Sequence, residues 1–127
     1  MPVSLDHFIV PSRDAAKAAK RLADLLGVEW SARAAAGPFS PVYVNEGLTL
    51  DFQTTREAFP IHHYCFRVSG TEFDAILGRI KAAGIPFRSS VMGPEDNQVG
   101  VEYGNVYWNE PDGHFWEILT KSYARKP

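Results

Sequence analysis

The chain has 127 residues, of which 45% are hydrophobic and 22% charged, and its formal net charge is −2 at pH 7. This length suffices for one globular domain, and the mixed, nearly balanced charges offer no basic surface for nucleic acid. No apolar stretch approaches the roughly 20 residues of a membrane helix, and no signal peptide is recognisable. The single cysteine, Cys65, excludes an internal disulfide framework. We expect one cytoplasmic domain, residues 1–127, without a nucleic-acid or membrane partner.

The first half of the chain predicts a strand followed by a helix. Residues 5–10 form an apolar run with β-forming residues. Ser12 is a candidate helix cap, and the Ala-rich segment 13–26 ends at Gly27. Three short strands are expected to follow, at residues 29–36, 39–45 and 47–54.

The second half predicts the same order of elements after a short linker at residues 56–60. Residues 61–68 form another apolar strand. Thr71 and Asp74 have the spacing of a capping box, and apolar residues follow at helical spacing before Gly84. Strands are then expected at 86–92, 103–110 and 114–121. The intervening segment 93–104 is rich in Gly, Pro, Asp and Asn, which is typical of a long functional loop or flap.

The two halves repeat this plan with nearly the same spacing. His7 lies 20 residues before Gly27, and His63 lies 21 residues before Gly84. Such a repeat indicates a duplicated unit. We therefore expect an α+β fold built from two βαβββ modules, at about 1–56 and about 60–124, that pack together as one domain.

The strand at 61–68 predicts one polar face and one apolar face. Side chains alternate across a strand, so His63, Cys65 and Arg67 share the face opposite the bulkier apolar residues. The apolar face should pack on the helix, which leaves His63 on the concave side. By the repeat, His7 occupies the equivalent place in the first half. If the register differs by one residue, His62 takes the role of His63, and this alternative stays open.

Glu117 lies in the last predicted strand among large apolar residues, where an unpaired charge is costly. A divalent metal bound by His7, His63 and Glu117 would satisfy this carboxylate and would explain two inward histidines. Asp51 is the first-half counterpart of Glu117. Whether Asp51 is a fourth ligand stays open.

Three more polar residues lie in or near the predicted strands of this site. Arg67 is a candidate to bind a substrate carboxylate or enediolate, and the alternative is an ion pair with Asp51 or Glu102. Cys65 is expected to pack rather than to act as a nucleophile. His114, which follows a turn, is expected to be solvated.

The second half resembles the modules of the vicinal-oxygen-chelate superfamily, the group of glyoxalases, bleomycin-resistance proteins and extradiol dioxygenases. The resemblance rests on the motifs His63-x-x-Phe66-x-Val68, Ala82-Ala83-Gly84-Ile85 and Glu110-Pro111-Asp112-Gly113-x-x-x-Glu117. The first half matches more loosely, through His7-Phe8-Ile9-Val10 and Leu25-Leu26-Gly27. The resemblance implies the glyoxalase/bleomycin resistance/dihydroxybiphenyl dioxygenase fold, in which paired modules form a half-open mixed β-barrel. It also places His7, His63 and Glu117 at the family's metal-ligand positions.

Tyr107 resembles the tyrosine that assists at the substrate in extradiol ring-cleaving enzymes. The matching residues are Val106-Tyr107-x-x-Glu110-Pro111. The same signature places a histidine upstream, where this chain has Gln98, Val99 and Gly100. This departure weighs against catechol cleavage. The resemblance keeps Tyr107 as a candidate catalytic residue beside Arg67 and Glu117.

The resemblance implies a divalent-metal-dependent enzyme of the glyoxalase or dioxygenase type, a lyase, isomerase or oxidoreductase. Such an enzyme holds a small substrate through two neighbouring oxygens, with Fe, Mn, Ni or Zn as the metal. The alternative is a bleomycin-resistance-like protein that sequesters a small molecule, although such proteins generally lack the ligand triad. A homodimer is expected, with modules paired within one chain or exchanged between two chains.

Overall fold

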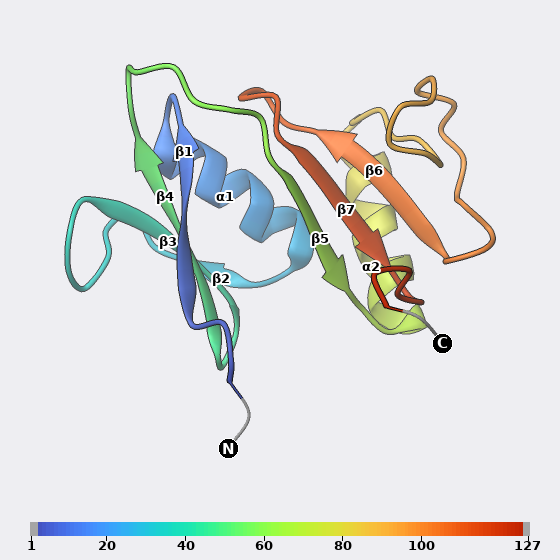
Figure 1. Ribbon diagram of the computed structural model, residues 1–127, viewed down its shortest axis with the longest axis horizontal. Helices are drawn as coiled ribbons and strands as arrows, with labels where there is room; N and C mark the ends of the chain where they lie inside the picture. The colour runs from blue at the N-terminus through green and yellow to red at the C-terminus, as the bar shows by residue number, and fades with distance from the viewer. Residues whose placement is uncertain (1–2, 126–127) are drawn as a thin grey trace. The chain divides into compact units, whose positions relative to one another are not determined.

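A computed structural model describes residues 3–125 of the chain. The chain divides into two compact units, Met1–Phe59 and Pro60–Pro127, and the boundary falls in the linker expected between the two halves. Each unit contains one helix and one mixed sheet (Figure 1). In the described part of the chain, no helix has the length and apolar character needed to cross a membrane.

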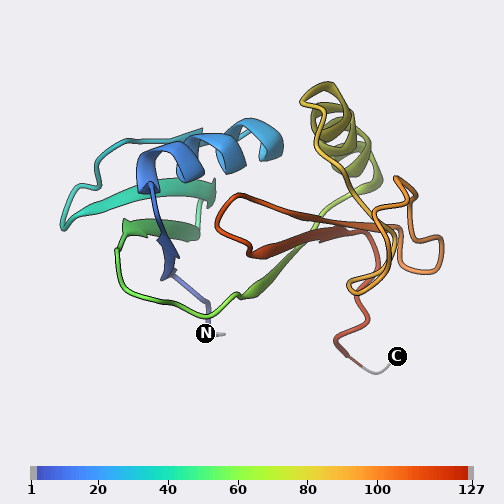
Figure 2. The same cartoon turned by 90° about the horizontal axis from the view of Figure 1, so that it is seen from above.

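The first unit is a four-stranded sheet with a helix on one face. Its elements are β1 (His7–Ser12), α1 (Ala15–Leu26), β2 (Glu29–Trp30), β3 (Phe39–Asn45) and β4 (Leu48–Thr54). The strand order is β1-β4-β3-β2, with β1 parallel to β4 and the other pairs antiparallel. α1 lies along the sheet (Figure 2), and its apolar stripe is buried because Ala19, Leu22, Ala23 and Leu26 recur at helical spacing. This unit has the predicted βαβββ order.

The second unit has a three-stranded sheet. Its elements are β5 (His63–Arg67), α2 (Gly70–Ala82), β6 (Asn105–Asn109) and β7 (Phe115–Leu119). The strand order is β5-β7-β6, with β5 parallel and β6 antiparallel to β7. α2 lies on one face of this sheet (Figures 1 and 2) and buries Phe73, Ile76, Leu77 and Ile80. β7 is therefore the central strand, with a neighbour on each side.

The strand predicted at 86–92 does not form, so the second unit is βαββ. Arg88 makes one isolated antiparallel bridge with Tyr107, and the chain then leaves the sheet. The strand cannot extend on either side of Arg88. Asn105, which would pair with Ser90 in a continued ladder, exchanges two backbone hydrogen bonds with Gly100 instead, and Pro86, which would pair with Asn109, has no backbone N–H. On the outer side, Asn97 accepts a hydrogen bond from the N–H of Phe87 with its side chain and donates its own N–H to the carbonyl of Phe87. We call residues 89–104 the flap.

Both helices begin at a side-chain cap, but neither cap is the predicted residue. Asp14 caps α1, whereas Ser12 accepts a hydrogen bond from the N–H of Asp14. Ser69 caps α2, two residues before the predicted Thr71. In both helices the cap is the short polar residue directly before the first helical residue. Gly27 ends α1 in the left-handed conformation, as its place after the apolar stripe predicts.

Aromatic side chains fill the buried face of the second sheet. The Trp116 ring stacks on Tyr64 and on Phe66, with centroids 4.6 Å and 5.9 Å apart. These residues lie on the face opposite His63 and Cys65, as the predicted alternation requires. Each sheet is open, and no strand pairing among residues 3–125 closes either sheet into a barrel. The α+β class is confirmed, with one helix and one mixed sheet in each of two modules.

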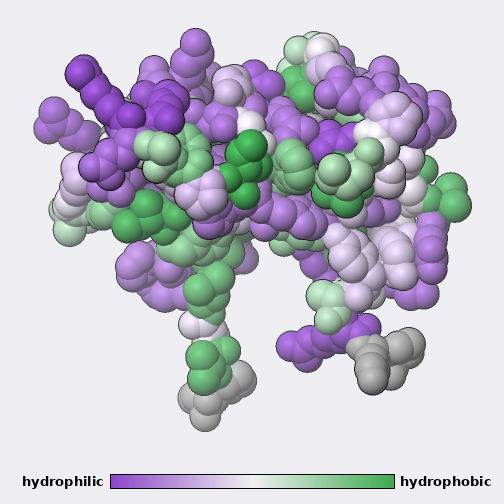
Figure 3. All heavy atoms as spheres, turned by 45° about the horizontal axis from the view of Figure 1, so that its top comes forward, coloured by the Kyte–Doolittle hydropathy of each residue, from purple (hydrophilic) through white to green (hydrophobic). Residues whose placement is uncertain are grey.

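The surface carries a few large apolar side chains. On the face drawn in Figure 3, hydrophilic and hydrophobic residues are interspersed. Two of the exposed apolar residues, Met92 (83% exposed) and Val101 (95% exposed), belong to the flap. The flap therefore exposes two large apolar side chains to solvent.

Candidate metal site

Glu117 is the centre of the candidate site. It lies on the central strand β7, and none of its side-chain surface is exposed. Its cross-strand neighbours are Cys65 on β5 and Tyr107 on β6, whose side chains point to the same face of the sheet. A carboxylate in such a place needs hydrogen-bond donors or a cation, because burying it unpaired is costly.

Three side chains satisfy this carboxylate. Nε2 of His63 lies 2.8 Å from Oε1 of Glu117, and the Tyr123 hydroxyl donates to the same oxygen at 2.5 Å. The side-chain amide of Asn105 donates to Oε2 at 2.9 Å. The prediction that this carboxylate needs partners is therefore right.

Sequence reasoning missed Asn105 and Tyr123. A signal for Asn105 was present, since it lies two residues before Tyr107 in one strand and so shares its face. Tyr123 follows the last strand and belongs to no motif. Only the folded chain brings its hydroxyl to Glu117.

The structure places His63, and not His62, beside Glu117. The His63 side chain is 40% exposed, so its free edge is open to a ligand. The His62 ring instead lies against Tyr64 and His114, with centroids 5.9 Å and 5.8 Å away. The register in which odd-numbered residues of β5 face the site therefore holds.

Tyr107 belongs to the same network. Its hydroxyl lies 3.2 Å from that of Tyr123, and its ring centroid lies 5.7 Å from that of His63. Because Tyr123 gives its one proton to Glu117, Tyr107 must donate to Tyr123. Burial raises the pKa of Tyr107, and the negative charge of Glu117 acts in the same direction. Tyr107 is therefore a neutral hydrogen-bond donor at physiological pH.

Cys65 and Arg67 share the face of His63. Partial burial raises the pKa of the Cys65 thiol to about 12, and the charge of Glu117 adds to this effect. The thiol is therefore protonated at physiological pH, which argues against a nucleophilic role, and the residue is exposed rather than packed as predicted. Arg67 is exposed and makes no ion pair with the described residues of its own unit, Glu102 included.

The first unit repeats the register of this site. His7 stands two residues before the cross-strand partner of Asp51, just as His63 stands two residues before that of Glu117. His7 is exposed, and its Nδ1 lies 2.7 Å from Oδ2 of Asp6. The Asp6 carboxylate raises the pKa of His7, and Asp51 adds a smaller effect.

Neither unit by itself, within residues 3–125, gathers three His, Cys, Asp or Glu side chains that could hold a metal ion. The second unit supplies one imidazole nitrogen and one carboxylate oxygen 2.8 Å apart. Nitrogen and oxygen donors of this kind suit divalent Fe, Mn, Ni and Zn. His63 and Glu117 therefore offer two donors that suit such an ion, and the two further candidate ligands, His7 and Asp51, belong to the first unit.

The turn between β6 and β7 corrects a prediction. His114 is fully buried rather than solvated. Its backbone N–H donates to Oε1 of Glu110 at 2.9 Å, and its Nδ1 accepts from the N–H of His62 at 3.0 Å. Burial raises the pKa of Glu110 to about 7, and the neighbouring charge of Asp112 adds to this shift.

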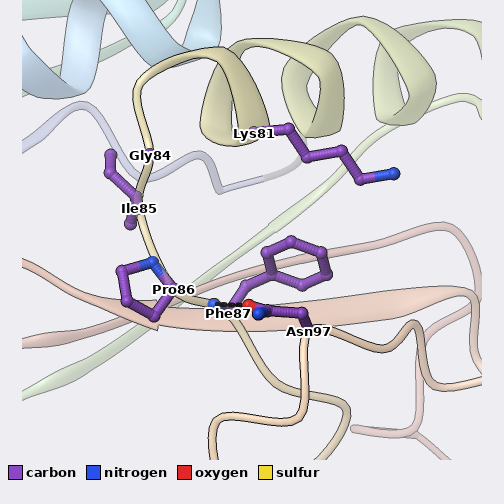
Figure 4. Close-up of a pocket in the computed structure, with 6 residues that line it drawn as sticks. All are labelled: Lys81, Gly84, Ile85, Pro86, Phe87 and Asn97. Carbon is purple, nitrogen blue, oxygen red and sulfur yellow. Dashed lines mark hydrogen bonds between the residues drawn. The ribbon is translucent and has the colours of Figure 1, made fainter.

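A cavity of about 740 Å³ in the second unit is lined by flap residues 89–91 and 99–103 together with Asn105, Tyr107 and Tyr123. It therefore adjoins the residues that hold Glu117. A smaller cavity, of about 350 Å³, lies at the end of α2 beside Lys81 and Asn97 (Figure 4), and no His, Cys, Asp or Glu lines it.

Solved structures similar to this chain include three informative ones. Oxidase ChaP-H2 is 37% identical, with a TM-score of 0.81 and coverage of 98% of each chain. A glyoxalase/dioxygenase from Nostoc punctiforme is 18% identical, with a TM-score of 0.69 and coverage of 94% of this chain and 91% of that chain. A fosfomycin resistance protein from Listeria monocytogenes, complexed with Mn(II) and sulfate, is 20% identical, with a TM-score of 0.67 and coverage of 97% and 94%. No protein-family model and no curated protein matches the chain.

Proposed function

The chain belongs to the vicinal-oxygen-chelate superfamily, and on that premise we propose that it is a divalent-metal-dependent oxidase. The substrate would be a small molecule held through two neighbouring oxygens. The observation that carries the proposal is the contact of His63 Nε2 with Oε1 of the buried Glu117, at 2.8 Å. An imidazole nitrogen and a carboxylate oxygen that face each other share a proton in a hydrogen bond. A divalent metal could take the place of this proton and bind both atoms as ligands.

We propose His7 as the third ligand, because it holds the place in the first sheet that His63 holds in the second. Asp51 stands where Glu117 stands and is proposed as a fourth ligand, directly or through water. Residues 1–127 would then act as one functional domain, with the modules joined within one chain or across a homodimer.

When bound, the ion would supply Lewis-acid stabilisation of negative charge on the substrate oxygens. The protein's own residues would orient the substrate around it. Tyr107 gives its proton to Tyr123, so its hydroxyl oxygen can accept a hydrogen bond from a substrate hydroxyl in the cavity. Arg67 has an exposed guanidinium on the same face and can bind a carboxylate or enolate oxygen. The cavity beside the flap provides room for the substrate.

The relative at 37% identity is named an oxidase, which favours redox chemistry for this chain. Redox chemistry in turn favours Fe or Mn over Ni or Zn. The second candidate function is sequestration of a small molecule without metal. The observation in its favour is the cavity of about 740 Å³ with Tyr103, Tyr107 and Tyr123 in its wall.

Metal analysis distinguishes these functions. Protein purified without added metal is quantified for Fe, Mn, Ni and Zn by mass spectrometry, before and after anaerobic reconstitution. We expect near-stoichiometric metal in the wild type and a large loss in His63→Ala, Glu117→Gln and His7→Ala. His62→Ala is the matched control, because its ring lies away from Glu117. A wild type that takes up no metal would sink the enzyme proposal and promote sequestration.

A further inference from the structure

We infer that Asn105 and Tyr123 are positioning residues that fix Glu117 for coordination through one oxygen, Oε1. The inference rests on the proposed metal site. A carboxylate can bind a metal through one oxygen or both, and the choice decides how many positions are left for substrate. The residues around Glu117 constrain that choice.

Asn105 holds the oxygen that faces away from His63. Its amide donates to Oε2 at 2.9 Å, and its side chain is buried, with 5% of the residue exposed. Its backbone is fixed by two hydrogen bonds with Gly100. Its Oδ1 packs so closely on Gly100 that an added Cβ there would lie 2.2 Å away. The amide therefore has one orientation, and because a carboxylate only accepts, the NH2 group points to Glu117.

Tyr123 holds Oε1, the oxygen that lies beside His63. Its hydroxyl donates to that oxygen at 2.5 Å and accepts from Tyr107. The ring is seated edge-on against Tyr103 of the flap, with centroids 5.1 Å apart. The backbone N–H of Lys121 donates to the Tyr103 carbonyl at 3.0 Å, which anchors the segment that carries Tyr123.

These contacts decide which oxygen of Glu117 faces His63. Oε1 lies beside His63 and receives the Tyr123 proton, while Oε2 accepts from the Asn105 amide. Oε2 keeps a second lone pair, so the orientation of the carboxylate and not a shortage of lone pairs favours one oxygen. Turning the carboxylate to bring Oε2 toward the same ion would strain both bonds and would deprive the buried Asn105 amide of its partner. Glu117 would therefore bind a metal through Oε1, with Oε2 held by Asn105.

The test measures Mn(II) affinity in the full-length protein by electron paramagnetic resonance of the free ion. Loss of an outer-shell partner lowers metal affinity by about 10–100-fold, and we expect this for Asn105→Leu and for Tyr123→Phe. Tyr43→Phe is the control. This substitution removes the same hydroxyl oxygen as Tyr123→Phe, but from an exposed residue on β3 of the other unit. Circular dichroism confirms that each variant is folded.

A second readout reports the coordination itself. The carboxylate stretches of ¹³C-labelled glutamate are compared in infrared difference spectra with and without Mn(II). We expect the wide splitting of one-oxygen coordination in the wild type and a narrower splitting in Asn105→Leu. A wild type that binds Mn(II) while both variants bind it equally tightly overturns this inference alone. A wild type that binds no Mn(II) overturns the proposed function and this inference with it.

Discussion

The backbone N–H of His62 donates a hydrogen bond to Nδ1 of His114, 3.0 Å away. This bond ties the start of β5 to the turn before β7, and the Phe115 N–H returns a bond to the His62 carbonyl at 2.8 Å. The two strands that carry His63 and Glu117 are thereby held in register at their first residues.

His114→Leu removes the acceptor for the His62 N–H while keeping an apolar side chain. An unpaired donor in a partly buried place costs about 1–3 kcal/mol, so we expect the free energy of unfolding to fall by about that amount. Urea denaturation followed by tryptophan fluorescence measures the change. His62→Ala is the control, because this bond uses only the backbone of residue 62, and a loss of the same size there would contradict the assignment.

Glu110 makes stability depend on pH. Burial and the charge of Asp112 raise the pKa of Glu110 from 4.5 to about 7. Between these two pH values the folded protein keeps a proton on Glu110 that the unfolded chain has released. The stabilising contribution of this group is complete below the unfolded pKa of 4.5 and is lost as pH rises through about 7.

The prediction is a fall in the free energy of unfolding between about pH 5 and pH 8 that is smaller in Glu110→Gln. Glutamine keeps an acceptor for the N–H of His114 but carries no titratable proton. Urea midpoints at several pH values measure both slopes. Parallel slopes for the two proteins would refute the role of Glu110.

Two glycines should respond oppositely to alanine. Gly104 has a φ of +56°, and a Cβ there would lie 2.3 Å from Oγ1 of Thr120, so Gly104→Ala should destabilise the protein by about 1–3 kcal/mol. Gly78 lies inside α2 with nothing within 4 Å of an added Cβ. Gly78→Ala should therefore stabilise it by about 0.5–1 kcal/mol. Thermal unfolding measures the change in stability of each variant. If both substitutions stabilise the protein, or both destabilise it, the local backbone geometry does not govern the change.

The proposed metal should also stabilise the folded protein. A ligand present at 100 times its Kd adds about 2.7 kcal/mol to the free energy of unfolding. We expect Mn(II) to raise the melting temperature of the wild type relative to protein in EDTA. The rise should vanish in His63→Ala. A rise of equal size in both would place the ion elsewhere on the molecule.

The features predicted well from the sequence are those that depend on periodicity and repetition. The alternation around His63 and the nearly equal spacing of His7 and His63 to their glycines are local patterns, and both sheets have the register that they require. The burial of Glu117 followed from its apolar neighbours in one strand.

The features missed depend on contacts between distant residues. The strand predicted at 86–92 does not form because Asn105 pairs with Gly100 rather than with Ser90, a competition between distant residues that strand propensity does not describe. His114 is buried because the turn before it folds the ring under β5. Tyr123 reaches Glu117 only because the chain after β7 returns to the sheet.

The missing fourth strand leaves the flap, residues 89–104, at the edge of the second sheet, while β5 and β7 lie side by side away from that edge. Replacements at flap residues other than Gly100 and Tyr103, which hold Asn105 and Tyr123, therefore leave the contact between His63 and Glu117 in place. The lining of the cavity can thus change in sequence while the paired strands beneath it stay the same.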